Sequence, residues 1–154
     1  VAELGKTKFL VVADRSGSVV AFDRKGKVRW RHFSGSEVVG PIANSGKTVF
    51  VPTGDGRQGF LVALNLSNGA PRWKHGFQSS LSGPALATND VVFATSADGR
   101  VYALSAKSGR KLWSEKVSST IEGGLTVAGN TLLVRAGNAE SNPGPELVAY
   151  RLGG

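Results

Sequence analysis

Short apolar runs separated by turn residues repeat along the whole chain. The runs at 8–13, 91–95 and 101–104 are strand-sized, and turn pairs such as Asn89-Asp90 and Asp98-Gly99 stand between them. Short apolar runs bounded by turn residues are typical of β-strands. No run approaches the ~18 residues that a membrane-spanning helix requires, and no useful segment has a helical period. The pattern predicts an all-β fold.

An internal repeat organises these runs. Three sets of markers recur at nearly constant intervals: Trp30, Trp73 and Trp113; Gly40, Gly83 and Gly123; and Ala21, Ala63, Ala103 and Ala149. The tryptophans and the glycines are both spaced by 43 and 40 residues, and the alanines by 42, 40 and 46. A period of about 40 residues that contains four short strands is the period of a β-propeller blade.

The distribution of apolar positions within one unit favours blades over a sandwich. The second and third strands are apolar on both faces, as expected for a sheet covered on both sides by neighbouring blades. The fourth strand alternates tryptophan with basic residues, which protect an outer edge from pairing with other chains. We predict four-stranded antiparallel blades at residues 1–34, 35–77, 78–117 and 118–154, the last without its outer strand. In the first blade, only a stub at Val1-Ala2 is available for the first strand.

The turn before each tryptophan carries a recognisable motif. Residues 103–113 and 63–73 resemble the pattern Ala-x-Asp-x-x-Thr-Gly-x-x-x-Trp of the quinoprotein-like (PQQ-like) repeat family, with Ser or Asn at the Asp and Thr positions. Residues 21–30 keep the Asp but are one residue shorter. The resemblance implies a propeller in which each tryptophan docks on the adjoining blade. It assigns a structural docking role to Trp30, Trp73, Trp113, Gly26, Gly69 and Gly109.

The number of units bears on how complete the propeller is. The family usually has seven or eight blades, so the resemblance implies that these four form the C-terminal half of a larger propeller, with further sequence upstream. A closed four-bladed propeller is the alternative. An open half would expose two blade faces, and we expect it to self-associate.

Candidate binding residues lie in the loops around the expected channel mouth. These loops connect the second strand of each blade to the third, and the fourth strand to the next blade, and such loops often carry binding residues. The polar side chains on these loops that could contact a ligand or partner are Arg15, Glu37, Arg57, Gln58, Gln78, Arg100, Glu122 and Asn138.

The sequence contains no recognisable catalytic or metal site. There is no Cys, and the two histidines, His32 and His75, occupy equivalent positions on different blades, too far apart to share a metal. A quinone-dependent dehydrogenase would need a stacked PQQ, Ca²⁺ held by carboxylate or amide oxygens, and an Asp base. Glu122 alone does not supply that set, so we expect no catalytic residue, metal or cofactor in this segment. PQQ and Ca²⁺ belong only to the dehydrogenase alternative.

The formal charge of +8 is concentrated at the predicted outer rim. Basic residues lie on the outer strands and in the turns that precede them. This rim either protects strand edges or contacts an acidic protein surface or anionic lipid. Exposed aromatics are not interleaved with the charges, so nucleic acid is not expected as a partner.

We therefore predict a non-enzymatic scaffold for protein–protein interaction. The resemblance implies a periplasmic or other extracytoplasmic place in a bacterium and a role in cell-envelope or outer-membrane protein assembly. Membrane association would come only from sequence beyond this chain. Two alternatives stay open: part of a PQQ-dependent dehydrogenase, or the extracytoplasmic sensor domain of a receptor or kinase.

Overall fold

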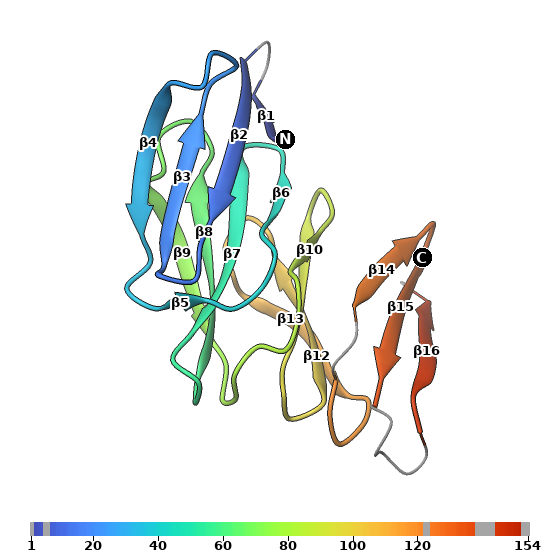
Figure 1. The fold of residues 1–154 in the computed structure, drawn as a ribbon. Helices are drawn as coiled ribbons and strands as arrows, with labels where there is room; N and C mark the ends of the chain where they lie inside the picture. Colours follow the sequence, from blue (N-terminus) through green and yellow to red (C-terminus); the bar gives the residue numbers. More distant parts are fainter. Residues whose placement is uncertain (1, 5–6, 122–123, 138–143, 152–154) are drawn as a thin grey trace.

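The computed structural model describes residues 2–4, 7–121, 124–137 and 144–151, and these form four antiparallel sheets that follow one another in chain order. Figure 1 shows the sheets side by side, from β1–β4 near the N-terminus to β14–β16 near the C-terminus. The described residues contain no helix that is long and apolar enough to cross a membrane. The architecture is that of part of a β-propeller, so each sheet is called a blade below.

Blades 1 and 2 contain the first nine strands. Blade 1 is formed by β1 (Ala2–Leu4), β2 (Thr7–Ala13), β3 (Ser18–Phe22) and β4 (Val28–Phe33), paired in that order. Blade 2 is formed by β5 (Glu37–Val38), β6 (Ala43–Ser45), β7 (Thr48–Gly54), β8 (Gly59–Asn65) and β9 (Pro71–Gly76). Both β5 and β6 pair with β7, so they are two pieces of one first strand that is interrupted at Gly40-Pro41. Proline interrupts strands because it cannot donate a main-chain hydrogen bond.

Blades 3 and 4 contain the other seven strands. Blade 3 is formed by β10 (Leu86–Ala87), β11 (Val91–Thr95), β12 (Arg100–Ser105) and β13 (Lys111–Lys116). The described part of blade 4 is formed by β14 (Leu125–Ala128), β15 (Thr131–Ala136) and β16 (Glu146–Arg151). The first strand of blade 1 differs from the sequence-based prediction, because β1 pairs Ala2 through Leu4 with β2, where only a stub at Val1-Ala2 was expected.

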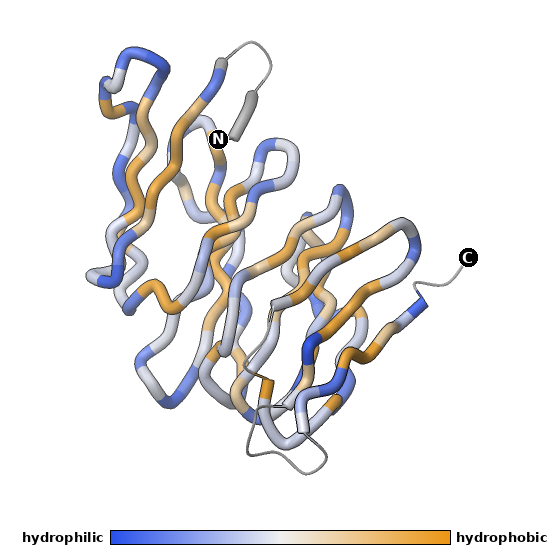
Figure 2. The backbone as a smooth tube through the Cα atoms, turned by 45° about the vertical axis from the view of Figure 1, so that its right-hand side comes forward, coloured by the Kyte–Doolittle hydropathy of each residue, from blue (hydrophilic) through white to orange (hydrophobic). Residues whose placement is uncertain are grey.

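Among the residues that the structure describes, the hydrophobic core forms three clusters, one between each pair of successive blades. The first contains Phe9, Val19 and Trp30 from blade 1 together with Val49 and Leu64 from blade 2. The second joins blades 2 and 3, and the third joins blades 3 and 4. Figure 2 shows hydrophobic colour concentrated along the strands and hydrophilic colour at many of the turns. Each inner blade therefore contributes apolar residues from both of its faces, because it is covered by a neighbour on each side.

The same irregularity recurs where the third strand meets the fourth. The strand register shifts after Ala21, Ala63 and Ala103, and in each blade this alanine lies opposite the tryptophan of the outer strand. A β-bulge at a fixed position bends the strand and redirects its side chains. The bulge thus recurs with the sequence repeat, each time beside the tryptophan of the outer strand.

Candidate functional site

The loops predicted to surround the channel mouth are joined in pairs by main-chain hydrogen bonds. In blade 1, the amide of Ser34 donates to the carbonyl of Gly17 over 2.9 Å. The amide of Phe77 donates to Gly59 in blade 2, and the amide of Val117 donates to Gly99 in blade 3, over 2.9 and 2.8 Å. In these three blades, the loop between the second and third strands is therefore held against the segment that leaves the fourth strand. We call these paired loops, residues 14–17, 34–37, 54–59, 78–82, 97–100 and 118–121, the loop face.

Arg15 and Glu37, each predicted as a binding residue, form an ion pair on the loop face. The Nε and Nη2 atoms of Arg15 both lie 2.5 Å from Oε1 of Glu37. The pair connects the loop of blade 1 to the first strand of blade 2. The Arg15 side chain is 89% exposed and the Glu37 side chain 41% exposed, so the pair is open to solvent and to any partner that approaches this face.

A hollow of about 760 Å³ lies beside this ion pair. Arg15 and Glu37 line it together with the chain around Gly40, and Gly56 and Ser80 contribute from the loops of blade 2. The hollow thus collects residues from several connections of the first two blades. Its size is within the range of ligand-binding sites, about 300–1,000 Å³. The candidate functional site is this hollow and the loops that border it.

Two aspartates shape the bordering loops. The Asp14 carboxylate accepts from the Ser16 hydroxyl and from the amides of Ser16 and Ser18, and these bonds hold its pKa below the usual value, the hydroxyl bond having the largest effect. Asp55 accepts from the amides of Gln58 and Arg57 over 2.8 and 2.9 Å, which lowers its pKa in the same way. Both aspartates stay ionised and fix loop conformation.

The aspartates were not among the predicted binding residues, although an available signal could have identified them. Asp14 precedes Gly17 by three residues, and Asp55 directly precedes Gly56. An aspartate shortly before a glycine is a common signal of a tight turn in which the carboxylate accepts main-chain amides. Ser80, which also lines the hollow, has no comparable signal in the sequence.

The other predicted binding residues are distributed around the loop face. Arg57 and Gln58 are exposed in the loop that follows Asp55, and Gln78 is exposed two residues before Ser80. Arg100 is half-buried, and its Nε lies 3.8 Å from Oδ2 of Asp98 within the same loop of blade 3. Glu122 and Asn138 lie outside the described residues. Of the eight predicted side chains, Arg15 and Glu37 are brought into contact and line the hollow.

A metal centre would need several donor side chains close together. In the parts of the chain that the structure describes, no three His, Cys, Asp or Glu side chains gather where they could hold a metal ion. Asp14 and Asp55 already accept amides of their own loops. His32 and His75 lie on the outermost strands of blades 1 and 2, where burial lowers the pKa of both. The described residues therefore offer no cluster of carboxylates of the kind that commonly binds Ca²⁺.

The basic rim has the location that the repeat predicted. Arg31 and Lys74 are exposed on β4 and β9, the outer strands of their blades. Lys74 Nζ lies 3.9 Å from the centre of the Phe60 ring, and Arg29 Nη1 lies 3.9 Å from Oδ2 of Asp23. Some of the rim charge is thus engaged by residues of its own blade.

The repeat and the sheet order match a known family. The sequence profile described as "Outer membrane protein assembly factor BamB" matches residues 4–60 and 57–150, which together make up most of the chain. The chain belongs to this family. Its members are PQQ-like repeat β-propellers, and the sequence-based recognition of that repeat is confirmed. No curated protein matches the chain.

Solved structures support the same assignment. The chain is similar to the crystal structure of BamB from Moraxella catarrhalis, with a TM-score of 0.79 and 26% identity over 97% of this chain. It spans 48% of the length of that BamB. The prediction of an all-β propeller segment is confirmed.

Two further structures share the fold alone. The computationally designed Ika4 protein matches with a TM-score of 0.76 and 18% identity, over 94% of this chain and 86% of the designed one. A quinohemoprotein alcohol dehydrogenase from Pseudomonas putida HK5 matches with a TM-score of 0.73 and 16% identity, over 95% of this chain and 31% of the enzyme. At these low identities, the similarity between this BamB-family chain and the dehydrogenase shows only a shared fold. Proteins with one fold can have many different activities.

Proposed function

We propose that this chain is an interaction module of the bacterial cell envelope that binds a protein partner through its loop face during outer-membrane protein assembly. Membership of the family supports the proposed role in assembly, since the matching profile is that of an outer membrane protein assembly factor. The single observation that supports the loop face is the hollow beside the Arg15–Glu37 pair. The proposal places the protein outside the cytoplasm and assigns no chemistry to it.

The physical basis for partner binding is a rigid platform with exposed charged and polar side chains. The backbone of the loop face is fixed by the paired main-chain hydrogen bonds and by Asp14 and Asp55. A fixed backbone loses little conformational entropy on binding. Arg57 and Gln58 extend from this platform into solvent. Complementary charge on the partner would fix the register of the complex and speed the encounter.

Acidic residues are the proposed chemistry of the partner surface. The chain carries 19 Lys and Arg against 11 Asp and Glu. A positive protein attracts negative surfaces over distances comparable with the Debye length, about 8 Å at physiological ionic strength. The loop face contributes Arg57 and Arg100 to this charge, whereas the rim contributes Arg31 and Lys74. Each pair carries two positive charges, so variants of the two pairs can be compared at equal net charge.

Charge reversal distinguishes the two surfaces. The double variant Arg57→Glu/Arg100→Glu and the rim variant Arg31→Glu/Lys74→Glu change the net charge equally. Each is expressed in a bacterial envelope with a photo-crosslinking residue at Gln78 or at Arg72. We expect a crosslinked partner from Gln78 that the loop-face variant loses and the rim variant retains. If the partner crosslinks only from Arg72, and only the rim variant loses that crosslink, the partner binds the rim. That result would refute the proposal that it binds the loop face.

A quinone-dependent dehydrogenase is the second candidate, because the fold is shared with a quinohemoprotein alcohol dehydrogenase. The test is the melting temperature of the chain with PQQ and Ca²⁺ added. Specific binding to the folded state raises that temperature by mass action. An unchanged melting temperature with unchanged PQQ absorbance would count against an enzyme site in this segment, and a clear rise would count against the purely non-catalytic role.

A further inference from the structure

A second pocket lies between blades 2 and 3, at the strand ends opposite the loop face. It has a volume of about 230 Å³ and is bordered by the β6–β7 hairpin, the β10–β11 hairpin, β9 and the turn before β13. Three basic side chains line it: Lys47 and Arg72 of blade 2 and Lys107 of blade 3. We call it the basic pocket. Both of its blades, residues 35–77 and 78–117, lie wholly within the described part of the chain.

Main-chain hydrogen bonds hold the two hairpins that border the basic pocket. The amide of Leu66 donates to the carbonyl of Lys47 over 2.9 Å in blade 2. The amide of Ala106 donates to the carbonyl of Asp90 over 2.8 Å in blade 3. Each hairpin is thus tied to the turn that precedes the outer strand of its own blade, so the backbone beneath the charged side chains is fixed.

A tryptophan joins the two blades at the pocket. The Nε1 of Trp73 donates to the carbonyl of Ala106 over 3.1 Å. Arg72 directly precedes Trp73, and Lys107 directly follows Ala106. This bond therefore keeps the backbones of Arg72 and Lys107 close together, although both side chains are positively charged. Like charges that a fold holds close together repel each other, and an anion between them relieves that repulsion.

The fold does not require basic residues at these three positions. In neighbouring blades, the corresponding residues include Asp90 for Lys47, Leu112 for Arg72 and Ser67 for Lys107. Lys47 lies in a hairpin and Lys107 in a turn, so neither protects an outer strand from pairing with another chain. The three charges therefore need an explanation other than the architecture of the blades.

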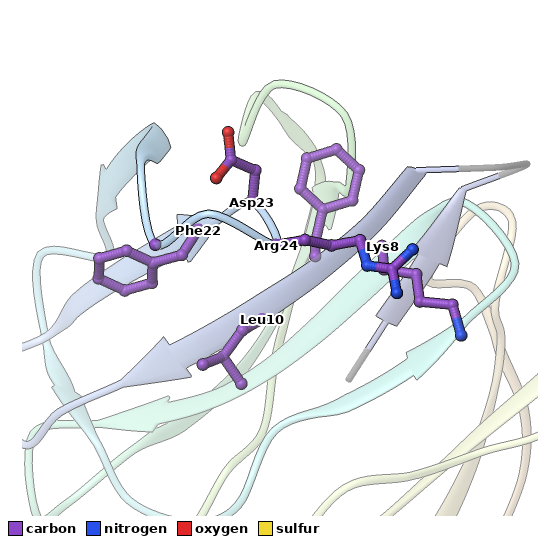
Figure 3. Close-up of a pocket in the computed structure, with 7 residues that line it drawn as sticks. Lys8, Leu10, Phe22, Asp23 and Arg24 are labelled. Atoms are coloured by element: carbon purple, nitrogen blue, oxygen red, sulfur yellow. The ribbon is translucent and has the colours of Figure 1, made fainter.

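Arg72 lacks the carboxylate that its counterpart in blade 1 has. Arg29 also directly precedes a tryptophan, and its Nη1 lies 3.9 Å from Oδ2 of Asp23. Figure 3 shows the Asp23 carboxylate in the turn of blade 1, pointing away from the side chain of Arg24. At the position of Asp23, blade 2 has the uncharged Asn65. Arg72 forms no ion pair with another described residue.

One carboxylate, that of Asp90, also borders the basic pocket. Its residue is exposed, and across the described ranges it forms no ion pair with Lys47, Arg72 or Lys107. Three cations and one carboxylate leave an excess of two positive charges around the pocket. A concave site lined mainly by one sign of charge concentrates the field and attracts ions of the opposite sign.

We propose that the basic pocket binds a phosphate group. The guanidinium of Arg72 can donate two parallel hydrogen bonds to phosphate oxygens, and the ammonium groups of Lys47 and Lys107 supply further charge. The pocket has room for about seven water molecules at ~30 Å³ each. It is therefore suited to a small ion or headgroup and is smaller than a site for a drug-sized ligand, about 300–1,000 Å³. The proposal does not depend on the loop face.

The first test follows phosphate binding by the chain in solution. Sodium phosphate replaces sodium chloride at constant ionic strength and pH while amide chemical shifts of the isotope-labelled chain are recorded. We expect saturable shifts at residues 46–48, 72–73, 89–90 and 106–107. Sodium acetate, added in the same way, has a single charge and is expected to bind more weakly.

Variants at matched positions locate the site. Arg72→Gln/Lys107→Gln removes two cations that different blades contribute to the pocket. Lys25→Gln/Arg29→Gln removes the cations at the corresponding positions of blade 1 and changes the net charge equally. The first double variant should weaken phosphate binding by about tenfold or more, as for loss of charge-assisted hydrogen bonds, and the second should bind like the native chain. All four side chains are exposed, so both variants should fold.

Asp90→Asn should change the affinity in the opposite direction. The carboxylate borders the same pocket and repels an anion there. Its loss should strengthen phosphate binding by up to about fivefold, the range of interactions between exposed charges. Stronger binding after this substitution would not follow from a merely structural role of the residue.

A lipid headgroup and a soluble phosphate compound are distinguished by sedimenting the chain with vesicles of phosphatidylglycerol and phosphatidylcholine. Vesicle binding that Arg72→Gln/Lys107→Gln loses and Lys25→Gln/Arg29→Gln retains would identify a lipid headgroup as the source of the phosphate. Saturable shifts from free phosphate without vesicle binding would identify a soluble phosphate compound.

Three results would overturn the proposal. The first is the absence both of saturable shifts around the basic pocket and of vesicle binding that the first double variant alone loses. The second is equal affinity for acetate and phosphate, which would show that the pocket does not select phosphate. The third is equal weakening in the two double variants, which would assign the binding to the general positive charge of the chain.

Discussion

Gly69 lies directly against the indole of Trp30, so closely that a Cβ at position 69 would stand 2.5 Å from Cε3 of the ring. Gly109 and Trp73 repeat this relationship at 2.6 Å. Real Cβ atoms do not approach other atoms this closely, and both glycines also have positive φ. Two independent requirements, backbone conformation and close approach of a ring, therefore make glycine necessary at these turns.

Comparing Gly69→Ala with Gly26→Ala separates those two requirements. Both variants place a side chain at positive φ, which costs about 1–2 kcal/mol. Only Gly69→Ala also forces the Trp30 ring to move, which adds about 1–3 kcal/mol for overpacking. We expect Gly69→Ala to lower the urea midpoint clearly more than Gly26→Ala. Equal midpoints would show that the ring contact contributes nothing beyond backbone strain.

Trp30→Phe tests the hydrogen bond that accompanies the ring contact. Trp30 is 7% exposed, and its Nε1 donates to the Leu66 carbonyl. Loss of the donor leaves a buried carbonyl without its partner and costs about 1–3 kcal/mol of unfolding free energy. Trp113→Phe is the control, since a phenyl ring can retain the contact with Tyr150. The interpretation fails if denaturant titration finds the control at least as destabilised.

Glu37→Gln should change stability little, even though it breaks an ion pair. Exposed pairs contribute about 0–1 kcal/mol, because solvent screens them, and the Arg15 side chain is 89% exposed. We expect an unfolding free energy within about 1 kcal/mol of the native chain, together with altered partner crosslinking at the loop face. A large loss of stability would instead assign this pair a structural role.

The histidines predict how stability changes with pH. Burial lowers the pKa of His75, the nearby Lys111 charge lowers it further, and a hydrogen bond with Gly109 opposes this; burial also lowers the pKa of His32. The unfolded chain therefore binds protons at a higher pH than the folded chain does. The contribution of the two histidines to stability is complete above their ordinary pKa of about 6.5, and it declines as the pH falls below that value.

Thermal unfolding measured from about pH 8 to about pH 5.5 checks this pH dependence. The native chain should melt at progressively lower temperature as the pH falls below about 6.5. The double variant His32→Gln/His75→Gln should show a flatter profile over that interval. Identical profiles for the two proteins would assign the pH dependence to other groups.

Much of the fold followed from local patterns in the sequence. The strands at 7–13, 91–95 and 100–105 lie within a residue of the predicted runs, because short apolar runs between turn residues have few other stable conformations. The interruption of the first strand of blade 2 and the pairing of Leu4 with Thr7 were missed. Short strands with weak patterns depend on a neighbouring strand for their register.

The candidate site was predicted in part. The loops follow from strand order, so Arg15 and Glu37 could be selected from a propeller topology alone. Their contact could not, because the residues are 22 positions apart and meet only when blade 1 is placed beside blade 2. Ser80 was missed for the same reason, since which side chains border a hollow depends on how neighbouring blades pack. Asp14 and Asp55 were missed although the glycine that follows each of them is a local turn signal.

The sequence by itself determined the repeat, the blade architecture and the family, because each blade forms from contiguous strands whose turns and apolar positions are local properties. Only the tertiary structure showed that Gly69 and Gly109 lie directly against the indoles of Trp30 and Trp73. The physical reason is that each of these two turns receives its ring from the preceding blade, so the contact depends on the packing between blades.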